Sequence, residues 1–252
     1  MMRKILLIGF AVIVYQYWEI EITFAEEATL SVHHLETPIY VNGNLDEGAW
    51  QKATQVKLVW MSDDNREKDD FQTSALIAYD DTALYIAFVN RDPDSSNLIA
   101  GLSMLENNAH VPRDDSVGIF IDTDNSDTGF FVVYLNSKNE IYSLWIPAQE
   151  LVKKIRDGNI PQKLIPVALA YSERSDWNPK GLQTATYIGK DIWIAEIKIP
   201  FEDLLTSKPS TKTWNANFVR HIPGWEDIWV TWAKTDQSLY RSSEFGSITF
   251  TK

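Results

Sequence analysis

Short apolar runs separated by turn residues recur along this chain from residue 38 to its end. They are rich in Val, Ile, Phe, Tyr and Trp, the residues that favour half-buried strands. Long amphipathic helical stretches do not separate them, so the pattern favours pairing between consecutive strands. The predicted strands are 38–41, 56–61, 72–79, 83–90, 116–122, 130–136, 140–146, 183–188, 192–199, 214–220, 228–233 and 246–251.

Turn residues stand between several neighbouring runs, at 79–83, 136–139 and 189–191. Asp, Asn, Ser and Gly at these places predict β-hairpins. Consecutive hairpins predict an all-β fold: a two-sheet antiparallel β-sandwich, immunoglobulin-like or jelly-roll-like, with little helix. Single helical turns are predicted at 46–53 and 200–205.

Two long stretches, 94–113 and 147–180, carry little periodic pattern and are dominated by Asn, Pro and charged residues. Loops of this length are uncommon in compact domains and are often functional. Binding surfaces and partial disorder are both open interpretations of them.

The N-terminus has the pattern of a secretory signal peptide. A basic start that includes Arg3 and Lys4 is followed by an uncharged apolar run over 5–15, which is shorter than the ~20 residues of a membrane span. We therefore expect a signal peptide over 1–25, a lead-in over 26–37 and one β-sandwich over 38–252, with no stable membrane span after cleavage. An uncleaved anchor is the alternative. The expected location is secreted, periplasmic or at the cell surface.

Charge and cysteine content exclude some classes of partner and of covalent attachment. The formal net charge is −12, and an acidic surface repels the phosphates of nucleic acids, so no nucleic-acid partner is expected. The chain has no Cys, which excludes disulfides and a cysteine-linked lipid anchor. An exported form would rely on packing or on metal for its stability.

Strands with acidic or Gly/Asn turn residues at one end lie at 41–50, 79–88, 114–122 and 192–201, and a tail of further strands comprises 214–220, 229–233 and 245–250. The order and spacing of these segments resemble the family 9 carbohydrate-binding modules. The resemblance implies a β-sandwich that binds a poly- or oligosaccharide without catalysis, often with bound structural calcium, in proteins of polysaccharide degradation. The expected function is thus an exported, non-catalytic carbohydrate-binding protein.

The resemblance to this family implies that two Trp side chains hold the terminal sugar ring between them. Trp232 matches the later one. At the place of the earlier one stands 110–113 with no Trp, so His110, Trp145 or Trp177 could substitute. The alternative for Trp232 is an ordinary place in the core, where most Trp side chains of a sandwich lie.

Polar residues at strand ends complete the predicted carbohydrate site. Carboxylates, amides and guanidinium groups can form paired hydrogen bonds with vicinal hydroxyls. The alternative is structural: Asp115 would cap a turn and Arg220 would pair with a nearby acid. The predicted carbohydrate-binding residues are Trp232, Asp115, Asp114, His110, Asn217, Arg220 and Asn136.

A loop rich in oxygen ligands follows the strand 116–122. Asp122, Asp124 and Asp127 offer carboxylates of the kind that calcium prefers, although the spacing is not that of an EF-hand. We predict a structural calcium ion here, with a solvated turn as the alternative.

Catalytic motifs are absent from the sequence: it has no Gly-x-Ser-x-Gly and no phosphate-binding loop. One rival function is a haem-binding electron-transfer sandwich, for which Met61, Met104 and His110 could supply axial ligands. Another is a structural or adhesion domain with a decayed sugar site.

Overall fold

The computed structural model describes residues 28–61, 69–101, 108–123, 129–147, 177–204, 206, 209, 213–224, 227–235 and 239–251. Strands dominate these residues, as predicted. The helical segments among them are 3-10 turns of three residues each: η1 (Trp50–Lys52), η2 (Asp69–Phe71), η3 (Ser95–Asn97), η5 (Val111–Arg113) and η7 (Ser242–Glu244).

Thirteen strands are described, and most coincide with the predicted apolar runs to within two residues. They are β1 (Thr29–His34), β2 (Thr54–Lys57), β3 (Val59–Trp60), β4 (Thr73–Tyr79), β5 (Ala83–Arg91), β6 (Ser116–Asp122), β7 (Gly129–Asn136), β8 (Ile141–Pro147), β9 (Gln183–Gly189), β10 (Ile192–Pro200), β11 (Thr213–Ile222), β12 (Ile228–Thr231) and β13 (Gly246–Thr251).

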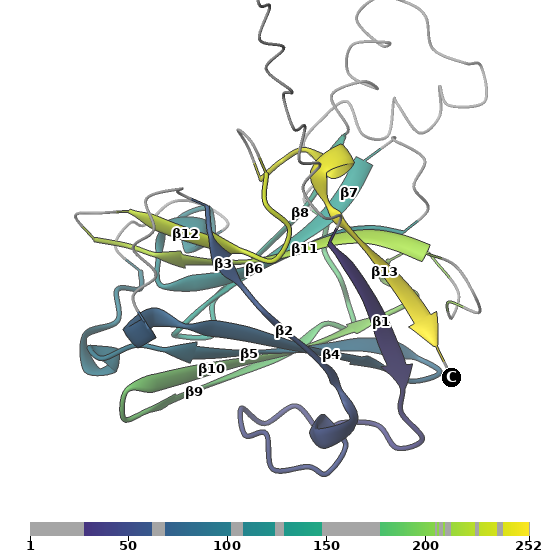
Figure 1. The fold of residues 1–252 in the computed structure, drawn as a ribbon, viewed down its shortest axis with the longest axis horizontal. Helices are drawn as coiled ribbons and strands as arrows, with labels where there is room; N and C mark the ends of the chain where they lie inside the picture. The colour runs from purple at the N-terminus through teal and green to yellow at the C-terminus, as the bar shows by residue number, and fades with distance from the viewer. Residues whose placement is uncertain are drawn as a thin grey trace, which may run out of the picture.

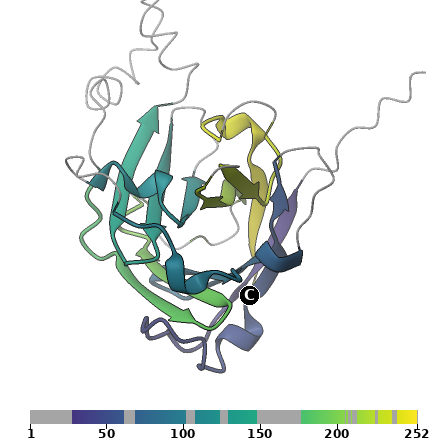
Figure 2. The same ribbon diagram turned by 90° about the vertical axis from the view of Figure 1, so that its left-hand side faces the viewer.

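Hydrogen bonds join the strands into one continuous sheet that curls over itself. Its main path runs β8-β7-β6-β11-β13-β1-β4-β5-β10-β9, with β12 beside β11 and β3, and β2 beside β4. Figure 1 shows the two layers of the sandwich, with β4, β5, β10 and β9 in one and β12, β11, β6, β7 and β8 in the other. β13 and β1 connect the layers at one side, and the view turned by 90° shows the sheet wrapping round a common interior (Figure 2).

Alternation along the strands fills the interior between the layers. Val117, Ile119 and Ile121 of β6 point inward, and Trp193 and Ile197 of β10 meet them from the other layer. Two smaller apolar clusters lie on the outer faces of the sheet, one under residues 35–53 and one under residues 239–245. Because both faces of β6 and β7 are covered, every residue of these strands is buried, which explains their continuous apolar sequences.

Aspartate side chains shape the turns that the sequence predicted. Asp80 Oδ1 accepts hydrogen bonds from the N–H groups of Thr82 (2.6 Å) and Ala83 (2.8 Å), and Tyr85 Oη donates to Asp80 Oδ2 (2.8 Å). One carboxylate thus closes the turn from β4 to β5.

The N-terminal boundary of the fold differs from the prediction. Residues 38–41 are not a strand, since Ile39 packs on an outer cluster from irregular backbone. Instead β1 lies inside the expected lead-in, and it pairs in parallel with β13 and β4, while the other strand pairs are antiparallel. The sequence did not predict β1 because most of its residues are polar: Val32 is its one fully buried side chain.

Smaller differences concern the short elements. The run predicted as one strand over 56–61 is divided into β2 and β3, which pair with different partners. The helical turn predicted over 46–53 is η1, and residues 201–204 form a turn instead of a helix. In the part of the chain that the structure describes, no helix has the length and apolar character needed to cross a membrane.

Candidate functional site at the acidic end of the sandwich

Several predicted site residues meet at one end of the sandwich, where β5, β7 and β11 end and β6 and β12 begin. The register brings these ends together, because His221 of β11 pairs with Ser116 of β6, which pairs in turn with Asn136 of β7. Two neighbouring groups of polar side chains lie at this end: a pocket between the layers, and a histidine-carboxylate group on the outer side.

The pocket is half-open and has a volume of about 230 Å³. Its lining includes four carboxylates and one amide together with apolar residues such as Phe71. The lining residues are Phe71, Asp92, Asp94, Asn97, Leu98, Ile99, Asp115, Ile222, Pro223, Gly224, Asp227 and Ile228. The pocket therefore offers hydrogen-bond acceptors beside apolar surface.

A buried guanidinium holds one of the carboxylates that line the pocket. Arg220 has no exposed surface, and its Nη2 donates to Asp92 Oδ2 (2.7 Å) while Nη1 donates to the carbonyl oxygen of Arg91 (2.8 Å). Burial lowers the pKa of Arg220 to about 10, against the opposing effect of Asp92 and Asp115. The guanidinium is therefore charged at neutral pH and offsets part of the negative charge of the pocket.

Asp115 links this guanidinium to the pocket wall. Its Oδ2 accepts a hydrogen bond from the N–H of Ile99 (2.7 Å), and the side chain is almost fully buried. Burial raises the pKa of Asp115 to about 6, although the Ile99 hydrogen bond and the charge of Arg220 act in the other direction. At neutral pH Asp115 is thus mainly ionised and can accept hydrogen bonds.

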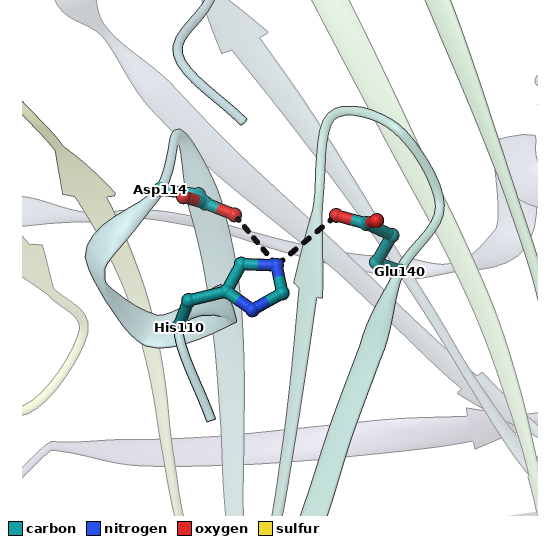
Figure 3. A group of neighbouring side chains, drawn as sticks. All are labelled: His110, Asp114 and Glu140. Atoms are coloured by element: carbon teal, nitrogen blue, oxygen red, sulfur yellow. Dashed lines mark hydrogen bonds and ion pairs between the residues drawn. The ribbon is translucent and has the colours of Figure 1, made fainter. Parts of the chain in front are cut away.

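The second group consists of His110, Asp114, Asn136 and Glu140, and we call it the histidine-carboxylate group. His110 Nε2 lies 3.3 Å from Glu140 Oε2 and 3.8 Å from Asp114 Oδ2. Figure 3 shows both carboxylates directed at this one nitrogen. Asn136 Nδ2 donates to Asp114 Oδ2 (2.8 Å) and to Glu140 Oε2 (2.6 Å), so the amide holds both carboxylates in place.

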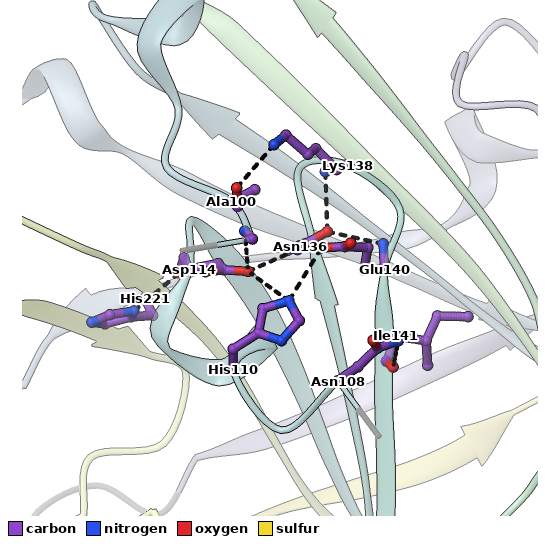
Figure 4. Close-up of polar contacts among 10 residues, drawn as sticks. Ala100, Asn108, His110, Asp114, Asn136, Lys138, Glu140, Ile141 and His221 are labelled. Carbon is purple, nitrogen blue, oxygen red and sulfur yellow. Dashed lines mark hydrogen bonds and ion pairs between the residues drawn. The ribbon is translucent and has the colours of Figure 1, made fainter. Parts of the chain in front are cut away.

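Backbone groups fix this arrangement from two sides (Figure 4). The N–H of Gly101 donates to Asp114 Oδ2 (3.0 Å). Asn136 Oδ1 accepts from the N–H groups of Lys138 (3.1 Å) and Glu140 (2.9 Å), which determines how the amide is oriented. The β7–β8 turn thus orients Asn136, and the loop before β6 helps to hold Asp114, whereas His110 Nδ1 is buried without a hydrogen-bond partner.

His221 lies between the two groups. Its Nδ1 donates to the carbonyl oxygen of Asp114 (3.0 Å), and its Nε2 lies 2.6 Å from Asp227 Oδ1 at the edge of the pocket. The ring of Trp229 stacks on His221, with centroids 4.3 Å apart. The pocket and the histidine-carboxylate group therefore share one support.

Two predicted site residues lie elsewhere along β11 and β12. Asn217 joins these strands: its Oδ1 accepts from Thr231 Oγ1 (2.9 Å) and from the N–H of Ala233 (3.0 Å). Trp232 is partly buried, and its ring lies 5.4 Å from that of Phe218. A ligand role for either residue stays a prediction.

The residues offered as substitutes for the missing Trp belong in part to the core. Trp145 is buried, and Trp177 packs on Phe131 at 4.8 Å while its Nε1 donates to the carbonyl oxygen of Asp203 (2.9 Å). His110 lies in the histidine-carboxylate group. Sequence reasoning missed Asp92, Asp227 and Glu140, for which the one available signal was a position beside a turn.

The calcium prediction falls largely on residues that the structure does not describe, whereas two of the three haem-ligand candidates are described: Met61 packs on an outer apolar cluster and His110 lies in the histidine-carboxylate group. Asp122 ends β6 with a buried side chain, whereas Asp124, Asp127 and Met104 lie outside the described residues. One buried carboxylate is compatible with a structural ion, and both predictions stay open.

Comparison with known proteins assigns the family. A family model described as "Carbohydrate family 9 binding domain-like" matches residues 41–252. This chain belongs to that family. The resemblance drawn from the four segments and the tail is thereby confirmed. No curated protein sequence matches the chain significantly.

Solved structures share the fold of this family 9 domain. A family 9 carbohydrate-binding module from Caldicellulosiruptor kristjanssonii, in complexes with cellotriose and with glucose, has a TM-score of 0.61 and 14% identity, over 88% of this chain and 93% or 95% of that chain. A Bacteroides uniformis protein for which carbohydrate binding is suggested has a TM-score of 0.63 and 13% identity, over 90% of this chain and 100% of that chain. At such identities the likeness supports the β-sandwich fold.

Proposed function

We propose that this protein binds carbohydrate without catalysis, at the pocket between the layers. Its family and the sugar complexes of the Caldicellulosiruptor kristjanssonii module support a sugar ligand. The observation that carries the location is the set of carboxylates and the amide that converge on one half-open pocket beside a buried guanidinium.

The chemistry of the pocket suits a sugar. Hydroxyl groups donate well to ionised carboxylates, and adjacent hydroxyls can share the oxygens of Asp94, Asp115 and Asp227. The ring of Phe71 offers apolar surface to the C–H groups of a pyranose. The volume of about 230 Å³ is below the ~300–1,000 Å³ of most drug-sized sites, which favours one or two sugar units at the end of a chain.

Export and a role in polysaccharide degradation belong to the same proposal. The signal-peptide pattern over 1–25 supports export, and a sugar-binding module outside the cytoplasm would meet polysaccharide fragments. Intact-mass and N-terminal analysis of protein from the native cells should find a mature form that begins near Glu26. A cytoplasmic protein that retains Met1 would contradict export.

Binding itself can be tested by calorimetric titration with cellotriose, glucose and a panel of oligosaccharides, each with calcium and with EGTA. Asp94→Ala and Asn97→Ala change exposed residues of the pocket, so they should leave folding intact. Each should weaken sugar binding at least about tenfold, because a hydrogen bond to a charged group contributes ~1.5–3 kcal/mol. Asp81→Asn, in the exposed β4–β5 turn, is the matched control.

Two outcomes would refute the proposal. One is an intact protein that binds no sugar of the panel under either condition. The other is sugar binding that Asp94→Ala and Asn97→Ala leave as strong as Asp81→Asn does, which would place the ligand away from the pocket.

A further inference from the structure

We propose that the histidine-carboxylate group binds a divalent transition-metal ion of the zinc class. The ligand atoms would be His110 Nε2, Asp114 Oδ2 and Glu140 Oε2, with water completing the coordination. This site is separate from the sugar pocket and from the calcium loop after β6.

The spacing of the three atoms suits one ion. They all lie within 4.8 Å of one another, and the nitrogen is 3.3 Å and 3.8 Å from the two oxygens. Ligands on a tetrahedral zinc ion with bonds of about 2.0–2.2 Å lie about 3.3–3.6 Å apart. The observed separations therefore need small side-chain movements to admit the ion, without a change of backbone.

Neighbouring donors hold the ligands in this arrangement. Asn136 donates to the two carboxylate oxygens that face His110, and Gly101 donates to that of Asp114. A carboxylate oxygen has two lone pairs. Glu140 Oε2 accepts one of these bonds and keeps a lone pair for a metal, whereas Asp114 Oδ2 accepts two and would give up one of them when it binds the ion. Donors of this kind around metal ligands orient them and raise metal affinity.

Charge favours a dication at this place. Asp114 is almost fully buried and His110 is 6% exposed, whereas the Glu140 side chain reaches solvent, so two negative charges meet one imidazole at the edge of the fold. The ammonium of Lys138 donates to the carbonyl oxygen of Ala100 (2.9 Å). The hydrogen bond from Asn136 lowers the pKa of Glu140, and the charge of Lys138 adds to this effect. A divalent ion would neutralise both carboxylates, whereas protonation of His110 neutralises one.

Access and ligand type indicate which ion. The Glu140 side chain is 38% exposed, so an ion can enter from solvent and keep bound water. Calcium prefers six to eight oxygen ligands, whereas zinc and its neighbours in the first transition row accept imidazole nitrogen together with carboxylate oxygen and can keep positions open for water.

The test uses tag-free protein stripped of metal with EDTA and titrated with Zn²⁺ in a calorimeter. We expect one ion per chain at this site. Co²⁺ provides a second probe, because coordination by this set should produce visible d–d absorption bands. Zn²⁺ should also raise the melting temperature, since a ligand that binds the native state alone stabilises it.

Three variants identify the ligands. His110→Ala should abolish the Co²⁺ bands and weaken Zn²⁺ binding at least about tenfold. Glu140→Gln keeps the shape of a partly exposed side chain and should weaken Zn²⁺ binding to a similar extent. If His110→Ala does not fold, Glu140→Gln alone decides whether the group binds the ion. His34→Ala is the matched control, because it removes another histidine that contacts a carboxylate, that of Asp81.

The proposal is overturned if the stripped protein takes up no Zn²⁺, or if Glu140→Gln binds Zn²⁺ as the unmodified chain does. Equal losses in Glu140→Gln and His34→Ala would also overturn it, since binding would then depend on surface groups in general. Calcium binding that His110→Ala leaves unchanged would belong to a different site and would not support the proposal.

Discussion

Adjacent residues at the acidic end serve different sites, because the chain is extended at Asp114, where it leaves η5 and enters β6. Asp115 contacts the N–H of Ile99 and feels the charge of Arg220, whereas Asp114 belongs to the outer histidine-carboxylate group. The sequence shows both as one acidic pair before β6 and cannot divide them without the sheet register. For the same reason the sequence did not predict the roles of Glu140 and Asp92, because their partners His110 and Arg220 are distant along the chain.

Removal of the Arg220 guanidinium should lower the stability of the fold, because a buried carboxylate would lose its cationic partner. Arg220→Met would leave Asp92 buried without its guanidinium, because the Arg220 Nη2 atom donates to it at 2.7 Å. We expect the free energy of unfolding to fall by about 3–5 kcal/mol in urea denaturation. Arg241→Met, which affects the partly exposed pair with Glu244, should cost less than about 1 kcal/mol. Similar costs for the two variants would contradict the buried role of Arg220.

Asp115 should make stability depend on pH. Burial raises its pKa from 3.8 to about 6, so the folded chain holds the proton more tightly than the unfolded chain. Its contribution to stability is therefore full below pH 3.8 and is lost as the pH rises to about 6. Asp115→Asn stays neutral and can still accept from Ile99 through Oδ1. Relative to the unmodified chain, its free energy of unfolding should rise across this interval.

At the scale of elements, one buried glutamate holds together two segments that are far apart in the sequence, around Asn42 and in β10. Glu196 of β10 has no exposed surface, and its Oε2 accepts from the N–H groups of Asn42 and Gly43, each at 2.8 Å. Its Oε1 accepts from Trp50 Nε1 (3.1 Å). Gly43 has a φ of 86° and lies against the carbonyl oxygen of Thr186, so a side chain there would be strained and crowded. The sequence showed both segments but not this bond between them.

Glu196→Gln tests that link. The amide would present its NH₂ group to at least one N–H donor, which would leave buried donors unsatisfied. We expect a loss of about 2–3 kcal/mol in the free energy of unfolding. Glu202→Gln changes an exposed acid that follows β10 and should stay within about 0.5 kcal/mol of the unmodified chain. Equal stability of the two variants would show that the segment around Asn42 is held by other contacts.

Trp232 directly follows β12 and packs against residues of β11 and β13. Its ring lies on Phe218, and a Cβ added to Gly246 would come within 2.7 Å of it. We expect Trp232→Ala to lower the free energy of unfolding by about 3 kcal/mol, with Tyr40→Ala, at a ring that is 76% exposed, as the near-neutral control. Unfolding and sugar affinity should be measured together. A stable Trp232→Ala variant that loses sugar binding would instead establish the ring as a sugar platform.

For the whole molecule, strand positions could be predicted because most strands are buried on one or both faces and stand out as apolar runs. The closure of the sheet could not be predicted from the sequence. It depends on β1, whose sequence Thr-Leu-Ser-Val-His-His has few apolar residues, and on parallel pairing with β13 from the other end of the chain. Neither local pattern nor turn chemistry encodes such a pairing, since the two strands are more than 200 residues apart.

The role of β1 leads to a prediction about the limits of the folding unit. The family match begins at residue 41, yet β1 lies before it and fills the place between β13 and β4. A chain beginning at residue 41 would expose two strand edges and lose the buried side chains of Val32, Leu35 and Ile39.

Burial of each such side chain contributes ~1.5–3 kcal/mol, so the three together approach the whole stability of many domains, ~5–15 kcal/mol. We therefore expect a chain of 28–252 to unfold cooperatively on heating, whereas a chain of 41–252 should aggregate or show no cooperative transition by circular dichroism and calorimetry. Addition of a separate peptide covering 28–40 should restore part of the transition if the loss is due to β1. Cooperative unfolding of 41–252 at the temperature of 28–252 would show that the sandwich is stable without β1 and that its closure does not depend on this strand.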